Sequence, residues 1–372
     1  MIFDSESVFE ENVITVLKQH GWKDGVLRYP TERDLLDNWK GILYRNNNDI
    51  DRLGKYPLTD GEMTQIIEQI ETLRTPLALN SFVNGRTVSI TRDNKEDVAH
   101  FGKEVSLYIY DRKEIAGGKS TYQIAQQPVY PAKNKMLNSR RGDLVLLING
   151  MPLIHIELKK SGIPVSQATN QIEKYAHEGV FTGLFRLVQI FVAMNPDDAV
   201  YFANPGVDKF NPSYYFHWAD YNNEPICGGQ NPGKDEWKLF IGGTSGTAGL
   251  LSIPMAHQLI GFYTIADSAD GCLKVLRSYQ YIAANAISDV VRKCDWEQRP
   301  ATPGRPGGYV WHTTGSGKTM TSFKSAQLIA DSHDADKVVF LMDRIELGTQ
   351  SLKEYRSFAD SETEVQGTEN TG

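Results

Sequence analysis

The pattern of apolar residues predicts a β-hairpin near the middle of the chain. One apolar run covers residues 144–148, a second covers residues 153–158, and the dipeptide Asn149-Gly150 stands between them. Asn-Gly is typical of a tight two-residue turn, because both of its residues accept positive φ. The pattern therefore predicts two antiparallel strands, and we expect the surrounding elements to be organised around them.

Other elements follow from the same periodicities. Residues 5–17 carry apolar side chains at helical spacing behind Ser5, which can cap a helix, and Gly21-Trp22 ends the segment. Two amphipathic helices near residues 31–43 and 60–73 are interpreted as an insertion before the sheet. Strands are expected near residues 87–91, 105–110, 122–130, 187–194 and 200–203, and a helix over residues 167–176. This order predicts an α/β domain.

The remainder of the chain changes character twice. Residues 205–260 are rich in glycine, proline and asparagine and are interpreted as a linker with some packed structure. Residues 308–319 then have the form of a strand, a glycine-rich turn and the start of a helix. Residues 337–342 are predicted to be a buried parallel strand that a helix follows. We therefore expect three parts, comprising residues 1–205, 206–260 and 261–372.

Composition narrows the class of protein. A chain of 372 residues is long enough for two or three domains, and 40% hydrophobic residues is typical of a globular protein. No run of about 18 apolar residues predicts a membrane span, and the N-terminus does not resemble a secretory signal. Three widely spaced cysteines give neither a disulfide framework nor a metal knuckle, so we expect a reducing, cytoplasmic location. They are Cys227, Cys272 and Cys294.

The hairpin carries the first candidate chemistry. Period-two alternation places Glu157 and Lys159 on one face of the second strand, and pairing can bring Asp143 beside Glu157. Two converging carboxylates repel each other unless a divalent cation lies between them, which is how a Mg²⁺ site is built. Lys159 could then act on a water molecule and stabilise charge on a phosphate. The alternative is a core β-ribbon with solvated charges at its edge.

Neighbouring residues add to this hypothesis. Gln167, Gln171 and Tyr175 share one face of the predicted helix, which makes a polar stripe that a plain surface helix does not need. Glu6 and Glu10 stand one turn apart on the first helix, and either could be a further acid or a surface residue. The net charge is −7, so any phosphate contact needs a local basic surface. One candidate is the run Lys133, Lys135, Arg140 and Arg141, which could equally be an exposed loop.

A second candidate site lies at residues 312–319. Successive main-chain N–H groups in such a glycine-rich turn, followed by a helix N-terminus, form a cradle for phosphate oxygens. Lys318 would reach the β and γ phosphates, and Thr319 would ligate Mg²⁺. Upstream, Gln280 could pair with an adenine edge, with Arg277 beside it. The candidate nucleotide residues are Arg277, Gln280, Thr314, Gly315, Ser316, Gly317, Lys318 and Thr319.

These motifs resemble a known family. Asp143 followed by Glu157-x-Lys159 is similar to the PD-(D/E)xK nucleases, although Gly142 replaces the proline of that name. Gln171-x-x-x-Tyr175 and the Trp-His-Thr-Thr-Gly-Ser-Gly-Lys-Thr loop resemble the restriction (motor and endonuclease) subunits of type I restriction enzymes. The resemblance implies a PD-(D/E)xK core, a mixed sheet flanked by helices, followed by a partial RecA-like parallel α/β motor lobe of superfamily 2 helicase type.

The resemblance also implies a function. Mg²⁺ and ATP would be the cofactors, and double-stranded DNA the substrate. Methyltransferase and specificity subunits would be the partners, so the DNA sequence would be recognised elsewhere. Asp143, Glu157, Lys159, Gln171 and Tyr175 would be the catalytic residues. No acidic Walker-B box follows the loop, so we expect a fragment that does not hydrolyse ATP by itself.

Two other functions remain open on the sequence. One is a DNA translocase or remodeller whose nuclease-like domain only binds DNA, which loss of metal affinity would favour. The other is a nucleotide kinase or transporter ATPase with an unrelated N-terminal domain. The element that contains Arg277 and Gln280 makes this function less favoured.

Overall fold

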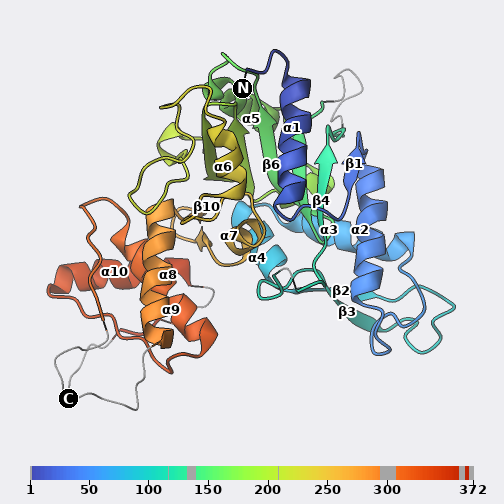
Figure 1. Cartoon of the computed structure of the whole chain (residues 1–372). Helices are drawn as coiled ribbons and strands as arrows, with labels where there is room; N and C mark the ends of the chain where they lie inside the picture. The colour runs from blue at the N-terminus through green and yellow to red at the C-terminus, as the bar shows by residue number, and fades with distance from the viewer. Residues whose placement is uncertain are drawn as a thin grey trace, which may run out of the picture.

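The computed structural model describes residues 2–115, 117–131, 140–207, 209–293, 307–359 and 365–367. Three residues singled out above, Lys133, Lys135 and Cys294, lie outside these ranges. A six-stranded mixed sheet forms the centre of the molecule (Figure 1), with strand order β1-β4-β5-β6-β7-β8. Pairs β1/β4 and β6/β7 are parallel, and the other three pairs are antiparallel. The sheet strands are β1 (Val26–Arg28), β4 (Tyr122–Gln126), β5 (Leu144–Ile148), β6 (Met151–Leu158), β7 (Ile190–Met194) and β8 (Ala199–Ala203).

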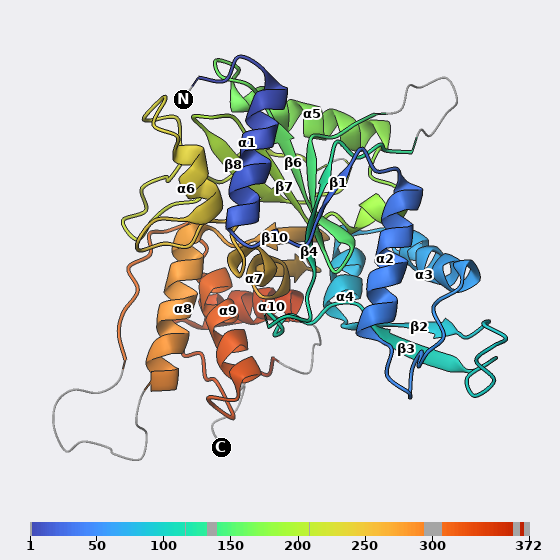
Figure 2. The same ribbon diagram turned by 45° about the vertical axis from the view of Figure 1, so that its right-hand side comes forward.

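Helices cover both faces of this sheet, as both ribbon views show (Figure 1 and Figure 2). Helix α5 (Val165–Glu178) packs Ala168 and Ile172 against one face, on which Phe191 of β7 also points. The alternate β7 residues face the larger core, to which α1 (Glu6–Gln19) contributes Phe9 and Val13. The predicted class, an α/β fold with a mixed sheet flanked by helices, is confirmed at this level.

The predicted hairpin is confirmed in detail. Its first strand has the predicted bounds, and its second begins two residues early, at Met151. Asn149 and Gly150 have φ values of 52° and 84°, as a turn with two left-handed residues requires. Every residue of both strands is buried, because β4 and β7 flank the pair and helices cover its faces.

The remaining N-terminal elements are close to those expected. The hairpin of β2 (Thr87–Thr91) and β3 (Glu104–Tyr108) forms a separate sheet that projects beside the predicted insertion helices. One helix was not predicted, although Thr75 caps it and Pro76 occupies its first turn, two ordinary start signals. A 3₁₀ turn over Gly183–Leu187 also precedes β7, which shortens the strand expected at 187–194. The helices are α2 (Glu32–Asn46), α3 (Asp60–Thr72) and α4 (Pro76–Asn84).

Residues 205–276 pack against the N-terminal elements. Trp237, in α6 (Glu236–Gly242), places its ring edge-on to Phe3 and Phe9. The Trp22 indole donates a hydrogen bond to the Leu251 carbonyl. This segment therefore shares the main hydrophobic core. Its other elements are η2 (Pro212–Tyr214), α7 (Met255–Gly261), β9 (Thr264–Asp267) and β10 (Cys272–Val275).

The C-terminal part differs from the predicted parallel α/β lobe. Its described residues form three helices, which lie below the sheet (Figure 1). The strands predicted at 308–312 and 337–342 are wrong, because both stretches are unpaired in the structure and Trp311 and Leu341 are 87% and 90% exposed. A parallel strand needs neighbouring strands to satisfy its main chain, and none lies beside either stretch in the described residues. The helices are α8 (Ser278–Lys293), α9 (Lys318–Ser332) and α10 (Ile345–Phe358).

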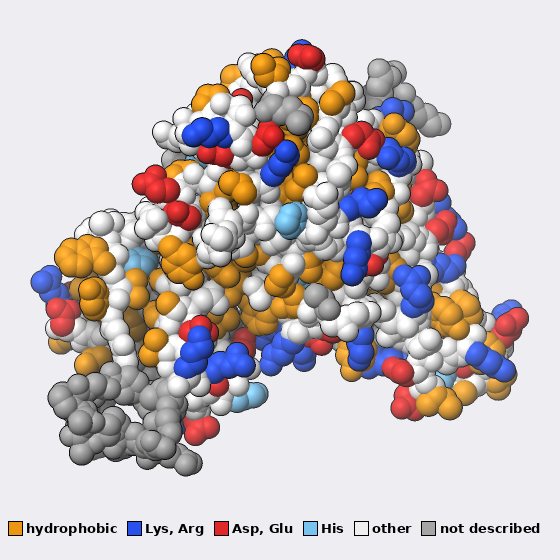
Figure 3. Space-filling view, viewed as in Figure 1, with side chains coloured by type: hydrophobic (Ala, Val, Ile, Leu, Met, Phe, Trp, Pro, Cys, Tyr) orange, Lys and Arg blue, Asp and Glu red, His pale blue; other side chains and the backbone are white. Residues whose placement is uncertain are grey.

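The visible surface carries charged side chains of both signs. On the face in Figure 3, basic and acidic side chains are interspersed, and hydrophobic side chains gather over the C-terminal helices. Among the described residues, no helix combines the length and apolar character that crossing a bilayer requires.

Candidate functional site

Two carboxylates meet at the end of the hairpin. Leu144 pairs with Ile156, and extending this register by one residue places Asp143 opposite Glu157. The Leu158 main-chain N–H donates to Asp143 Oδ2 at 2.6 Å, which fixes the aspartate across the strands. Glu157 is fully buried, and neither of its carboxylate oxygens has a hydrogen-bond partner in the described part of the chain. The sheet thus brings together the first two predicted site residues.

Lys159 lies at the same point. Its Nζ is 3.6 Å from Glu157 Oε1 and 3.6 Å from Glu6 Oε1, and it donates to the Leu158 carbonyl at 2.8 Å. Glu6 reaches this position because the N-terminal segment crosses the end of β6, where Phe3 and Ser161 exchange two hydrogen bonds. The strand face and the N-terminal segment together complete a compact cluster of opposite charges.

Burial changes the acidity of both carboxyl groups. Desolvation and the neighbouring Glu157 charge raise the pKa of Asp143 well above its usual range. Desolvation raises the pKa of Glu157 to about 8, although the Lys159 ammonium opposes this rise. The Lys159 ammonium is a single positive charge beside two carboxyl groups, and a bound cation would supply the further positive charge that favours their ionised forms.

The structure separates the two candidate acids of the first helix. Glu10 is buried and accepts hydrogen bonds from the side-chain amides of Gln126 and Gln127. Burial raises its pKa, and its charge in turn raises that of Asp143. Glu6 is about half exposed and faces Lys159. Glu10 is therefore an enclosed second acid, and Glu6 a partner of the lysine.

Helix α5 connects to the start of the hairpin. Gln171 Nε2 donates to the Tyr175 hydroxyl at 2.7 Å, and this hydroxyl donates to the Arg141 carbonyl at 2.9 Å. Arg140 also forms a salt bridge at 2.8 Å with Glu178, at the end of the same helix. The predicted glutamine and tyrosine thus hold the main chain that leads into Asp143. No interaction joins either side chain to Lys159 in the described residues.

The residues of this cluster fit a magnesium ion. Both Glu157 oxygens are buried without a hydrogen-bond partner among the described residues, and Asp143 lies across from them. Within the described ranges, no three histidine, cysteine or carboxylate side chains converge as a metal-binding group. Mg²⁺ does not require three, because it is usually held by one or two carboxylates and keeps several waters.

The phosphate-loop residues form a second group. Gly315 and Gly317 have φ values of 77° and 79°, and α9 begins directly at Lys318. Lys318 Nζ donates to the Thr313 carbonyl at 3.0 Å, inside the loop. The loop and helix start are therefore formed although the preceding strand is absent from the structure.

The element at Arg277 and Gln280 contacts this loop directly. Gln280 Nε2 donates to the Gly317 carbonyl at 3.2 Å, and the Tyr279 hydroxyl donates to the Ser316 carbonyl at 2.8 Å. The Gln280 side-chain oxygen accepts from the Arg277 N–H. The sequence placed these residues in one site, and the structure shows them in contact.

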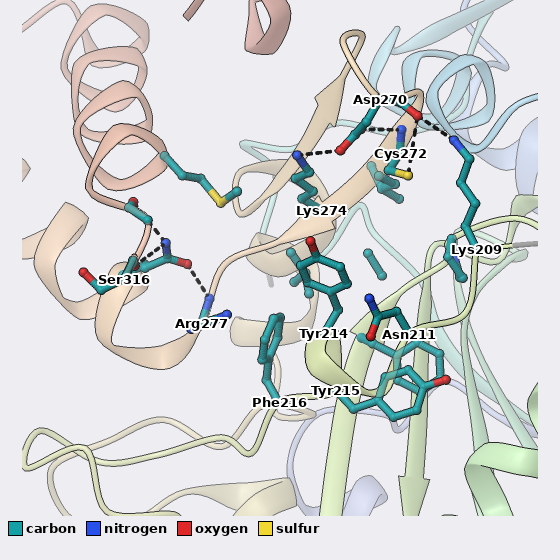
Figure 4. A pocket seen from close by; sticks show the side chains of 18 of the residues that line it. Lys209, Asn211, Tyr214, Tyr215, Phe216, Asp270, Cys272, Lys274, Arg277 and Ser316 are labelled. Carbon is teal, nitrogen blue, oxygen red and sulfur yellow. Dashed lines mark hydrogen bonds and ion pairs between the residues drawn. The ribbon is translucent and has the colours of Figure 1, made fainter. Parts of the chain in front are cut away.

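A cavity of about 260 Å³ opens beside this contact (Figure 4). Phe216 and Arg277 line it, and the guanidinium lies 4.5 Å from the centre of the phenyl ring. Lys274 forms ion pairs with Asp267 and Asp270 at another side of the cavity. No motif in the sequence marks Phe216, which follows an irregular segment.

Two residues beside the carboxylates were also missed. His155 is fully buried two positions before Glu157, and its Nδ1 lies 2.8 Å from the Tyr130 hydroxyl. Burial lowers the pKa of His155 to about 4, so the ring is neutral near pH 7. Period-two alternation could have revealed His155, since it shares a face with Glu157 and Lys159.

Known proteins are similar to both parts of the chain. A family model described as the type I restriction enzyme R protein N terminus matches residues 4–210, and one described as SWI2/SNF2 ATPase matches residues 279–371. An endonuclease subunit of a type I restriction enzyme from Staphylococcus saprophyticus is 31% identical over 100% of the chain and 35% of its own length. One from Staphylococcus aureus is 32% identical over 96% of the chain and 34% of its length.

A shorter relative extends the similarity to another organism. The EcoprrI type I restriction enzyme endonuclease subunit of Escherichia coli is 26% identical over 83% of the chain and 90% of its own length. The chain spans about a third of the length of the staphylococcal relatives.

Proposed function

The chain belongs to the family of type I restriction enzyme R proteins, and on this premise we propose that its hairpin carries a Mg²⁺-dependent endonuclease site for double-stranded DNA. The observation that carries the proposal is the pair Asp143 and Glu157. Glu157 is buried and Asp143 is partly buried, and the pKa of each is raised. Neither Glu157 oxygen has a hydrogen-bond partner among the described residues, although Lys159 and His155 lie within ion-pair distance.

The residues divide the work as follows. Asp143 and Glu157 would hold the Mg²⁺ ion, which supplies a Lewis acid and lowers the pKa of a bound water. Lys159, 3.6 Å from Glu157, is placed to orient that water and to stabilise charge on the phosphate. Gln171 and Tyr175 hold the main chain ahead of Asp143, which keeps the two carboxylates opposite each other. Their role is to position the aspartate.

The second part of the proposal concerns nucleotide. The turn at Gly315 and Gly317 and the start of α9 would present main-chain N–H groups to the phosphates. Lys318 would reach the β and γ phosphates, and Thr319 would ligate Mg²⁺. Thr314 and Ser316 belong to the same loop, and the cavity beside Gln280 and Arg277 would receive the base. In the assembled enzyme, ATP would drive DNA translocation.

The partners follow from the family. We propose that the protein works with methyltransferase and specificity subunits, which recognise the DNA site, and that cleavage takes place at a distance after translocation. The DNA sequence would then be specified outside this chain. The match of residues 279–371 to a SWI2/SNF2 ATPase supports a motor in preference to a nucleotide kinase or a transporter ATPase.

Titration of Mn²⁺ by calorimetry, with and without a short DNA duplex, tests the nuclease site. We expect the wild-type chain to bind Mn²⁺ and Asp143→Ala to lose this binding, because one of two carboxylate ligands is removed. In an assembled enzyme, Asp143→Ala should abolish cleavage and leave ATP hydrolysis nearly intact. Absence of Mn²⁺ binding by the wild type, even with DNA, would favour a translocase whose nuclease-like domain only binds DNA. Cleavage by the assembled variant would rule out the nuclease assignment.

A further inference from the structure

A histidine and a tyrosine pair directly behind the carboxylates. The Tyr130 hydroxyl lies 2.8 Å from His155 Nδ1, and the other ring nitrogen, Nε2, lies 3.3 Å from Glu157 Oε2. Both rings are buried, with exposures of 1% and 0%. His155 Nε2 and both Glu157 oxygens lack a completed hydrogen bond within the described residues. The imidazole therefore faces a carboxylate whose other polar neighbours are Lys159 and Asp143.

The imidazole ring is held by aromatic side chains on several sides. Its centroid lies 5.5 Å from that of Phe181, 6.0 Å from that of Phe191 and 6.4 Å from that of Tyr175. A ring enclosed in this way has little freedom to rotate, so Nε2 keeps its direction toward Glu157. The enclosure makes His155 suitable as a fixed hydrogen-bond partner for the Glu157 carboxylate.

The same pair explains why glycine precedes Asp143. A Cβ atom on Gly142 would lie 2.5 Å from the Tyr130 hydroxyl oxygen and 2.9 Å from His155 Cε1. Both distances are too short for a real contact, so the two rings occupy the space that a side chain at position 142 would need. The departure from proline at this position is therefore linked to Tyr130 and His155 by packing.

We propose that His155, held by Tyr130, is a positioning residue that orients Glu157 for a divalent cation. The Tyr130 hydroxyl donates to Nδ1, which leaves the proton on Nε2 directed at Glu157 Oε2. A small rotation of the carboxylate completes this hydrogen bond, and Oε1 then remains for the cation on the side of Lys159. The inference rests on the proposed metal site and assigns it an orienting group outside the motif.

The test measures Mn²⁺ affinity by calorimetry for the wild type, His155→Leu and His155→Gln. Leucine removes the donor, and loss of an orienting group of this kind lowers metal affinity by about 10–100-fold. Glutamine can both accept from Tyr130 and donate to Glu157, so it should restore most of the affinity. His257→Gln is the matched control, because His257 is also fully buried with its Nδ1 2.8 Å from a tyrosine hydroxyl, that of Tyr122, but faces the Asp111 carbonyl.

A second variant tests the packing argument independently. Gly142→Ala should displace Tyr130 or His155 and weaken Mn²⁺ binding in the wild-type background. In the His155→Leu background it should weaken binding little further, because the orienting contact is already lost. Thermal unfolding of every variant shows which of them fold, and the His257→Gln chain should bind Mn²⁺ as the wild type does.

The outcomes separate the inference from the function on which it rests. No Mn²⁺ binding by the wild type would overturn the proposed metal site itself. Wild-type affinity in a folded His155→Leu chain would overturn the inference and leave the metal site standing. An affinity for His155→Gln as low as for His155→Leu would also overturn the orienting role, as would additive losses in Gly142→Ala combined with His155→Leu.

Discussion

The hairpin and the phosphate loop carry the two sets of motif residues, and they are held in place by different means. In the hairpin, Glu157 belongs to β6 and Asp143 directly precedes β5, and both strands are paired on both sides and buried throughout. Residues 308–312, before the loop, and residues 337–342, after α9, are unpaired, and Trp311 and Leu341 in them are exposed. Even so, the loop turns at Gly315 and Gly317, and the helix begins where the motif requires.

The difference separates two kinds of site. A site made by cross-strand register depends on the whole sheet, because each side chain is placed by residues distant in sequence. A phosphate loop depends on a few consecutive residues and a helix start, supported here by Gln280 and Tyr279. Changes to the core should therefore act on the first site and leave the second nearly unaffected.

Truncation of a buried strand residue should give the largest contrast between the regions. Leu146 of β5 is fully buried between β4 and β6, whereas Val339 is 85% exposed. Leu146→Ala should lower the free energy of unfolding by about 2–5 kcal/mol through lost burial and a cavity. Val339→Ala should change it by less than about 0.5 kcal/mol. Urea unfolding followed by tryptophan fluorescence measures both, and equal effects would contradict the comparison.

Acidification should act mainly on the sheet region. Burial lowers the pKa of His257 to about 4 from its usual 6.5. Between these values the unfolded chain binds a proton at His257 that the folded chain does not. The contribution of His257 to the free energy of unfolding is therefore fully present above pH 6.5 and is lost as the pH falls toward 4. The loss is about 1.4 kcal/mol per pH unit, or about 3 kcal/mol in all.

The His257→Gln variant tests the origin of this loss. The variant should lose only the contribution of His257 to the slope, about 1.4 kcal/mol per pH unit between pH 6.5 and 4. The contribution of His155, which has the same sign, and that of Glu157, which has the opposite sign because its pKa is raised to about 8, are present in both proteins. Unfolding free energies at half-unit pH steps measure the slope. A slope in the variant equal to that of the wild type would place the acid sensitivity elsewhere.

The features predicted from sequence alone are those that a local pattern of residues determines. The Asn149-Gly150 turn fixes the hairpin and hence the meeting of Asp143 with Glu157, and the Ser5 cap fixes the first helix. The glycine-rich loop and its helix were predicted for the same reason. Each of these features is encoded within a few consecutive residues.

What sequence missed depends on tertiary packing. His155 and Tyr130 are 25 residues apart and meet only because the segment after β4 runs beside the segment before β5, where Val129 bridges Arg141, and β5 pairs with β6. Phe216 reaches the cavity from an irregular segment. The strand expected at 337–342 has a suitable apolar run, but a run alone does not supply the neighbours that a parallel strand needs. The roles of the site residues remain predictions for the experiments above.

Substitution of Lys318 should have the smallest effect on the free energy of unfolding, but it should lower the affinity for one ligand, Mg²⁺-ATP. Its side chain is exposed and donates to the Thr313 carbonyl of the same loop, so Lys318→Ala should change the free energy of unfolding by less than about 0.5 kcal/mol. A charge-assisted contact with phosphate contributes about 1.5–3 kcal/mol, so the affinity for Mg²⁺-ATP should fall by about 10–100-fold. Calorimetric titration of the nucleotide measures the change.

The matched control is Lys353→Ala, an exposed lysine on α10 outside the loop, which should bind nucleotide as the wild type does. Mn²⁺ affinity at the hairpin should be the same in both lysine variants, because the loop is held locally and places no residue among the carboxylates. Loss of Mn²⁺ binding in a folded Lys318→Ala chain would contradict this independence, since it would mean that the loop and the hairpin carboxylates form one coupled site.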